Sequence, residues 1–162
     1  HLVLRRQRQM CIRDRTLIAT HCESGPVMLQ NEREILRAKD ALTIEDHPRV
    51  RDVEACFAAS EYAVGLAKKH GSQLHVLHIT TAKELDLFSP GPIDDKNITA
   101  EACVHHLWFT DDDYPRLGNF IKCNPAIKSR QDRDALIKAL RTGRIDIIAT
   151  DHAPHTLSLI HI

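Results

Sequence analysis

The sequence has no run of about 18 apolar residues, so it predicts no helix that spans a membrane. Neither sign of charge is in excess, because 22 basic and 22 acidic side chains give a formal net charge of zero. This balance gives no electrostatic reason to expect nucleic acid as a partner. The five cysteines form no CxxC pair, and their odd number without a signal peptide is typical of reduced thiols. We therefore expect a cytoplasmic protein.

Aromatic side chains are also scarce, with four Phe, two Tyr and one Trp, whereas eleven of the 162 residues are histidine. The rest of the composition, 43% hydrophobic and 27% charged, is that of a globular domain and excludes a low-complexity chain. The length suits one domain with a buried core. The histidines are the feature that needs a chemical explanation.

The two ends of the chain differ in pattern from its middle. Residues 1–15 carry five Arg and one Asp with no helical or strand period, and residues 157–162 form a short apolar stub. We interpret both as non-native sequence of adapter or vector type and expect the domain to occupy residues 16–156. Residues 16–156 alone carry a net charge of −4, so the basic first segment contributes to the neutral balance.

Between these ends, strand-like and helix-like segments alternate. Short runs rich in apolar and β-branched residues predict strands over 16–20, 73–80, 98–109 and 145–150, with a short extended piece over 120–124. Helical patterns cover 27–42, 50–70, 81–88 and 129–140. The second has an apolar stripe at positions 53, 56, 57, 60, 64 and 67 and ends at Gly71. Ser129 caps the last, whose Asp132, Asp134 and Lys138 are expected to face water. The order predicts a parallel α/β sheet or barrel. The strand over 16–20 and the cysteines at 22, 56, 103 and 123 are expected to be buried.

Three predicted strands end on a side chain that can bind a metal, namely His21, His78 and Asp151. Because the carboxyl ends of parallel strands converge on one rim, these three side chains are expected to meet there. Imidazole and carboxylate groups suit zinc, and a catalytic zinc keeps one position open for water. Asp151 can then take a proton from the attacking water and return it to the leaving nitrogen. Each histidine taken alone has a plain alternative as a hydrogen-bonded structural residue.

Two further histidine groups bear on this rim. His155 follows Asp151 by four residues, and Pro154 can aim its ring at the same pocket, where it can hold a substrate carboxylate. His105 and His106 are adjacent on a predicted strand, so at most one of them faces the rim.

The chain contains six motifs in sequence, namely T-H-C-E (20–23), H-P-R-V-R-D-V-E-A-C (47–56), L-H-V-L-H-I-T-T (74–81), I-T-A-E-A-C-V-H-H-L (98–107), K-C-N-P-A-I-K (122–128) and A-T-D-H-A-P-H (149–155). Together they resemble the later half of a dihydroorotase of the amidohydrolase superfamily. The resemblance implies a partial TIM (β/α)₈ barrel, made of strands five to eight with their helices. It also implies zinc-dependent, reversible hydrolysis of L-dihydroorotate to N-carbamoyl-L-aspartate, in pyrimidine biosynthesis.

The resemblance also implies residue roles. His21 and His78 correspond to metal ligands on strands five and six, and Asp151 to a metal ligand that shuttles the proton. Asn124 corresponds to the residue that binds the substrate ring, and His155 to the one that binds its carboxylate. One or two zinc ions, a small-molecule substrate, and a homo-oligomer or an aspartate transcarbamoylase partner are the implied associations, with neither nucleic acid nor membrane.

The family's H-x-H motif, its bridging acid or carboxylated lysine and its early Arg and Asn have no counterpart here. A full barrel needs about 250 residues, so we expect a fragment that is inactive and binds metal weakly on its own. Its two open sheet edges are expected to favour association.

Two other functions remain open at this point. One is a different cyclic amidohydrolase, a hydantoinase or allantoinase, and Asn124 and His155 favour the carboxylate-bearing dihydroorotate over such substrates. The other is a non-catalytic dihydroorotase-like scaffold for a partner transferase. The presence of His21, His78 and Asp151 counts against a scaffold, and an upstream H-x-H motif would decide between them.

Overall fold

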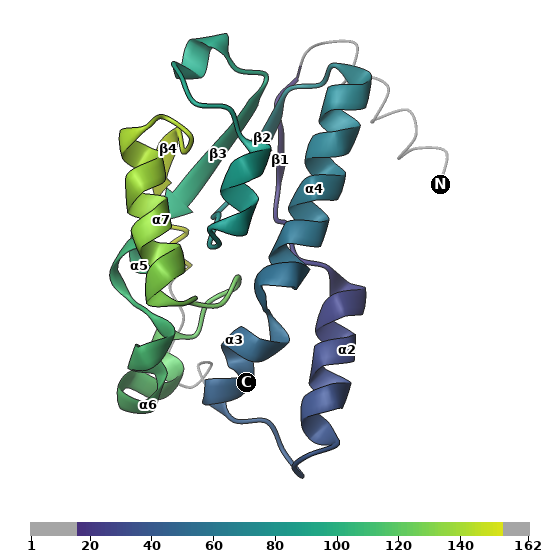
Figure 1. Ribbon diagram of the computed structural model, residues 1–162, viewed down its shortest axis with the longest axis vertical. Coiled ribbons are helices and arrows are strands. Elements are labelled where there is room, and N and C mark those ends of the chain that lie inside the picture. Colours follow the sequence, from purple (N-terminus) through teal and green to yellow (C-terminus); the bar gives the residue numbers. More distant parts are fainter. Residues whose placement is uncertain (1–15, 154–162) are drawn as a thin grey trace.

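The computed structural model describes residues 16–153 and contains a four-stranded parallel sheet (Figure 1). Its strands are β1 (Ile18–Thr20), β2 (Leu74–Val76), β3 (Ile98–Cys103) and β4 (Ile147–Ala149). They lie side by side in chain order, and every neighbouring pair is parallel. The predicted parallel α/β fold is therefore confirmed. His155 and the segments interpreted as non-native, 1–15 and 157–162, lie outside the described residues.

Helices and 3₁₀ turns connect the strands. The longer helices are α2 (Gly25–Leu36), α4 (Val53–His70) and α7 (Arg130–Arg141), and the short ones are α3 (His47–Val50), α5 (Val104–Trp108) and α6 (Tyr114–Leu117). The 3₁₀ turns are η1 (Ile44–Asp46), η2 (Lys83–Leu87), η3 (Ile93–Asp95), η4 (Asp111–Asp113) and η5 (Gly118–Ile121). No helix within residues 16–153 is both long enough and apolar enough to cross a membrane.

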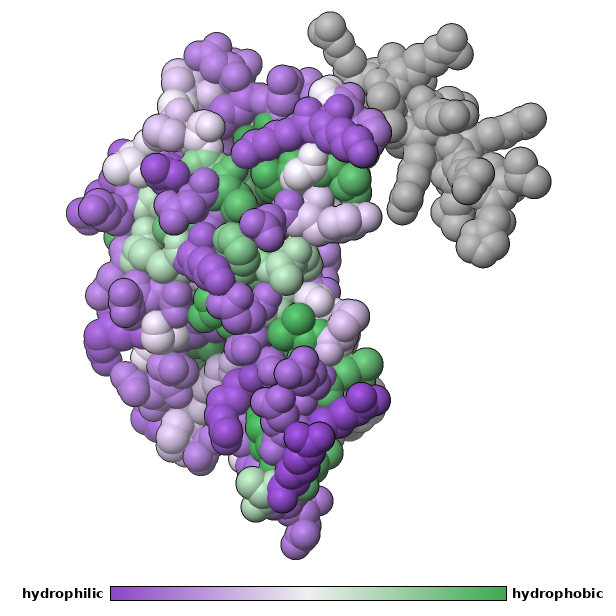
Figure 2. All heavy atoms as spheres, turned by 45° about the vertical axis from the view of Figure 1, so that its right-hand side comes forward, coloured by the Kyte–Doolittle hydropathy of each residue, from purple (hydrophilic) through white to green (hydrophobic). Residues whose placement is uncertain are grey.

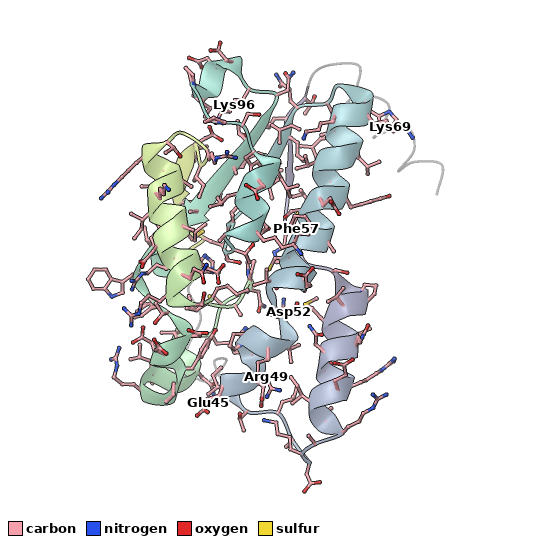
Figure 3. The ribbon with its side chains drawn as sticks, viewed as in Figure 1. Glu45, Arg49, Asp52, Phe57, Lys69 and Lys96 are labelled. Carbon is pink, nitrogen blue, oxygen red and sulfur yellow. The ribbon has the colours of Figure 1, made fainter. Side chains whose placement is uncertain are left out.

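Helix α4 follows its sequence pattern closely. The Asp52 side chain caps its first turn by accepting a hydrogen bond from the Ala55 N–H at 2.8 Å, at the position labelled in Figure 3. Gly71 ends the helix with a left-handed φ of 62°, which a residue without Cβ adopts freely. The predicted apolar stripe is buried at Cys56, Ser60, Val64 and Ala67.

Helices α4 and α7 lie on the same side of the sheet (Figure 1). The main core forms between them and the strands, and it includes Val64 and Ala67 of α4, Leu136 and Ala139 of α7, Leu74 and Val76 of β2, and Ala100 and Ala102 of β3. Because side chains alternate along a strand, His75, Thr99 and Glu101 point to the opposite face. His75 Nδ1 lies 2.8 Å from Thr99 Oγ1, and its Nε2 lies 3.1 Å from Glu101 Oε2. One face of the sheet is therefore apolar, and the other carries a polar row.

Several predicted elements differ from the structure. The predicted strand over 98–109 ends at Cys103, where α5 begins, so His105 and His106 lie on a helix and the strand argument about them was wrong. The predicted extended piece over 120–124 begins in the 3₁₀ turn η5. The helix predicted over 27–42 ends at Leu36.

Two predictions of burial also differ. The strand predicted to be buried over 16–20 is exposed on β1, where Ile18 keeps 38% of its surface accessible. Asp132, expected to face water, is buried because its carboxylate accepts hydrogen bonds from the Ala82 N–H at 2.8 Å and from the Ser129 hydroxyl. The cysteine prediction is confirmed for positions 22, 56 and 103, while Cys123 is partly exposed.

Apolar side chains also reach the surface on the face that carries α4 and α2, where they form scattered patches between polar residues (Figure 2). Tyr62 and Leu66 of α4 and Leu29 of α2 are exposed residues of these helices.

Candidate metal centre

His21 and His78 meet at the carboxyl ends of β1 and β2. His21 follows β1 directly, and His78 follows β2 by two residues. His21 Nδ1 lies 3.1 Å from His78 Nε2, and the two ring centroids are 4.8 Å apart. The parallel pairing of the two strands thus brings together side chains that are 57 residues apart in the sequence.

The second ring nitrogen of His21 pairs with the buried carboxylate of Glu23. His21 Nε2 lies 2.9 Å from Glu23 Oε2, and the same carboxylate oxygen accepts from Arg51. The Glu23 side chain is only 1% exposed, whereas that of His21 is 44% exposed. This buried carboxylate fixes the imidazole orientation and leaves Nδ1 turned toward His78.

The backbone at His78 is in the left-handed region, with φ of 39°. Such a conformation is uncommon for a residue with a Cβ and is found at sites where surrounding contacts hold it. Here the His78 N–H donates to Glu101 Oε1 at 3.3 Å, and Glu101 is itself held by His75. Burial lowers the pKa of His78, and the neighbouring His21 adds to this effect while Asp151 opposes it. His78 is therefore neutral at pH 7 and keeps a lone pair for a metal.

Asp151 follows β4 by two residues and lies exposed at the same rim. It also has a left-handed φ, of 44°. The structure therefore brings His21 and His78 into contact and leaves Asp151 exposed at the carboxyl end of β4 in the same sheet. The meeting of Asp151 with the two histidines stays a prediction.

Asn124 lies exposed in the loop between η5 and α7, and a cis peptide bond joins it to Pro125. His47 Nε2 anchors this loop by donating to the Cys123 carbonyl at 2.8 Å. The roles inferred for Asn124 and for His155, which lies outside the described residues, remain predictions.

The donor set fits a divalent cation such as zinc. Two nitrogens that share one zinc at about 2.0–2.1 Å in tetrahedral geometry lie roughly 3.3 Å apart, close to the observed 3.1 Å between His21 Nδ1 and His78 Nε2. A second group of donors, Cys103, His105 and His106, also has one potential ligand atom per residue within 4.8 Å of the others.

The sequence patterns assign no role to the residues that hold the two histidines. Glu23, Arg51 and Glu101 all stand inside the quoted motifs. The available signal was chemical, because an acidic residue inside an apolar strand such as I-T-A-E-A-C is rarely buried without a partner. Glu101 has such partners in His75 and the His78 N–H.

The fold is that of part of the TIM barrel of amidohydrolases. L-hydantoinase from Arthrobacter aurescens matches with a TM-score of 0.83 at 23% identity, over 93% of this chain and 33% of that chain. Dihydroorotase from Campylobacter jejuni matches with a TM-score of 0.55 at 25% identity, over 65% of this chain and 31% of that chain. No protein-family model matches the chain.

Comparison with the sequences of curated relatives narrows the similarity from amidohydrolases in general to dihydroorotases. Dihydroorotase from Lactobacillus acidophilus is 33% identical over 139 residues, which is 86% of this chain and 32% of that protein. Dihydroorotase from Bacillus caldolyticus is 46% identical over 91 residues, or 56% of this chain and 21% of that protein. The chain thus resembles the dihydroorotases of the amidohydrolase superfamily, and it spans about a third or less of the length of these relatives.

Proposed function

We propose that this chain supplies the carboxyl-terminal strand ends of a metal-dependent dihydroorotase, which reversibly hydrolyses L-dihydroorotate to N-carbamoyl-L-aspartate in pyrimidine biosynthesis. The observation that carries the proposal is the pair of facing nitrogens, His21 Nδ1 and His78 Nε2, 3.1 Å apart at the carboxyl ends of β1 and β2. The similarity to curated dihydroorotases supports the choice of substrate.

Each residue has a defined part in the proposed reaction. His21 and His78 hold a divalent cation, with zinc as the ion of choice and one or two ions in the complete site, and Asp151 joins them as a ligand. The cation supplies Lewis-acid chemistry that polarises the cyclic amide and acidifies water. Asp151 takes the proton of the attacking water and returns it to the leaving amide nitrogen. Asn124 holds the substrate ring, and His155 holds its carboxylate.

The left-handed backbone at His78 and Asp151 supports this assignment. Two residues with a Cβ carry this φ in the part of the chain that the structure describes, and both follow a strand at the rim. Unfavoured backbone conformations collect at sites where function over-determines them. A structural role alone would not require both exceptions at one end of the sheet.

The proposal also includes a cellular location, which the cysteines support, and a binding partner. All four cysteines within residues 16–153 are free thiols, which supports a reducing cytoplasmic location. A second copy of the chain or an aspartate transcarbamoylase is the proposed partner, and neither nucleic acid nor a membrane is part of the proposal.

A chimeric enzyme tests the function. Residues 16–156 would replace the matched segment of Lactobacillus acidophilus dihydroorotase, and the unaltered enzyme would serve as the control. We expect the zinc-loaded chimera to hydrolyse dihydroorotate in preference to hydantoin and allantoin, while the isolated chain shows no turnover. A folded chimera that prefers hydantoin or allantoin would assign the chain to the other cyclic amidohydrolases. One that binds zinc but turns over none of the three would favour the scaffold function.

A further inference from the structure

A second set of metal-capable side chains lies where β3 passes into α5. Cys103 ends β3, and His105 and His106 lie in the first turn of α5. One potential ligand atom from each of the three lies within 4.8 Å of the others. None of them is among His21, His78 and Asp151, and the proposed reaction uses none of them.

His106 has the hydrogen-bonding pattern of a metal ligand. It is 4% exposed, and its Nε2 donates to the Pro125 carbonyl at 3.0 Å. With the proton on Nε2, the lone pair is on Nδ1, and this nitrogen is buried without a hydrogen-bond partner. Metal-binding imidazoles are commonly held this way, with one ring nitrogen donating to a carbonyl and the other free for the metal.

His105 adds a second such nitrogen. Its Nε2 is also buried without a partner, and the centroids of the two adjacent rings are 4.2 Å apart. A buried polar atom without a hydrogen bond is costly, by about 1–3 kcal/mol, so two neighbouring examples call for an explanation.

Cys103 provides a soft third donor. Its side chain is fully buried at the end of β3, and it makes no side-chain cap hydrogen bond to α5. A thiolate with two imidazoles is a ligand set that suits zinc or copper(I) rather than magnesium or calcium.

We propose that Cys103, His105 and His106 form a cation site for a soft metal ion of the zinc or copper(I) type, separate from the His21 and His78 pair. The ion binds through the Cys103 sulfur, His105 Nε2 and His106 Nδ1. Binding displaces the thiol proton to solvent, so each ion bound releases one proton from Cys103.

Cobalt(II) tests this site on the purified 162-residue chain after chelator treatment. A cobalt–thiolate bond gives a charge-transfer absorption that imidazole and carboxylate ligands do not give, so the band reports only a site with a cysteine. We expect the band to appear in a titration with about one cobalt per chain, and to disappear when zinc is added. A folded chain, checked by circular dichroism, that gives no band would overturn the proposal.

Variants locate the site. Cys103→Ser is expected to abolish the band, and His105→Gln, at a half-buried position that tolerates change, to weaken cobalt binding by at least about tenfold. Cys123→Ala is the matched control, because its sulfur lies 3.6 Å from His106 Nε2 on the side already bonded to Pro125, and the band should persist. Persistence of the band in Cys103→Ser, or its loss in Cys123→Ala, would contradict the assignment.

The double variant His21→Asn with His78→Asn separates the site from the proposed catalytic metal. The band is expected to remain, since neither substituted residue is a ligand of the soft site. If it vanishes in a folded protein, Cys103 shares an ion with the rim histidines and the separate site is wrong. The dihydroorotase proposal does not depend on this outcome, because it rests on the rim residues and on the chimera.

Discussion

The two ends of the same sheet are built in opposite ways. At the amino ends of β3 and β4, Lys96 and Asp146 form an ion pair with Nζ 2.6 Å from Oδ1, and their side chains are 6% and 2% exposed. Lys96 also donates to the Gly143 carbonyl, and Asp146 Oδ2 accepts from the Ala100 N–H at 2.9 Å. Lys96 lies in the loop before β3 in Figure 3. Both of these buried charges therefore have bonded partners.

At the carboxyl ends of the strands, the hydrogen bonding of buried polar atoms is incomplete among the described residues. Four buried side-chain nitrogen or oxygen atoms in residues 16–153 have no hydrogen-bond partner, and all belong to residues just after β1, β2 or β3. They are Glu23 Oε1, His78 Nδ1, His105 Nε2 and His106 Nδ1. Both left-handed residues with a Cβ are also found at this end.

The two ends of the sheet therefore have different roles. Unmade hydrogen bonds and unfavoured φ angles lower stability, and they are tolerated where a ligand can satisfy them. The satisfied amino end and the core beneath α4 and α7 stabilise the sheet that carries the reactive end. Substitutions at the two ends should therefore affect different measurements.

The largest expected effect is on turnover at the carboxyl end. In the chimera, Asp151→Asn keeps the shape of the side chain but removes its ability to take a proton. We expect kcat for dihydroorotate hydrolysis to fall by about 10²–10⁴-fold, with a melting temperature close to that of the parent chimera. A rate within about threefold of the parent would exclude Asp151 as the proton-transfer group.

The next effect is on stability at the amino end. Asp146→Asn leaves the Lys96 ammonium buried without its counter-ion, which should lower the free energy of unfolding by about 3–5 kcal/mol. Urea unfolding of the purified chain measures this loss. Asp134→Asn is the control, because its pair with Arg133 is exposed and should contribute about 1 kcal/mol or less. Equal losses in the two variants would show that burial of the Lys96 pair is not what stabilises this end.

The sequence predicted the regions whose polar groups are hydrogen-bonded better than it predicted the site at the carboxyl ends of the strands. The parallel arrangement of the strands, the Gly71 and Ser129 helix ends and the apolar stripe of α4 follow from local patterns and are confirmed. The predicted strand over 98–109 failed at Cys103, because its apolar residues suit a strand and a short helix equally well. That error hid the close approach of the His105 and His106 rings, whose centroids are 4.2 Å apart.

The predicted meeting of His21, His78 and Asp151 followed from topology alone, since strand ends converge in a parallel sheet. Their supporting contacts did not follow. The link from Arg51 through Glu23 to His21 joins different segments of the chain, and no local pattern encodes which carboxylate meets which ring. The same holds for the contact between Glu101 and the His78 N–H.

Those supporting contacts give a third and smaller effect. Glu101→Ala removes the acceptor that holds the His78 N–H and the partner of His75. We expect zinc affinity at the rim to fall by about 10–100-fold, measured by competition with a chelating dye in the Cys103→Ser background. Glu101→Gln keeps an acceptor for the N–H and should recover most of the affinity. Failure of glutamine to improve on alanine would mean that Glu101 acts by its charge rather than by positioning.

The smallest effect tests whether the loops around the reactive end also contribute stability. Asp46, buried in η1, accepts from the Thr43 N–H at 2.8 Å and pairs with Lys39. Burial raises the pKa of this carboxyl, but the bonds to Lys39 and Thr43 outweigh burial and lower the pKa from 3.8 to about 2.

Because the folded-state pKa of Asp46 is the lower one, its stabilisation is fully present above about pH 4 and is lost as the pH falls toward about 2. Lys39 is partly exposed, so solvent reduces the contribution to about 1–2 kcal/mol. The difference in unfolding free energy between the parent chain and Asp46→Asn should therefore shrink by most of this amount between about pH 6 and pH 2. A difference that stays constant with pH would show that the bonds of Asp46 add no electrostatic stability. The bonded amino end would then be the tested source of that stability, and the two ends would differ more.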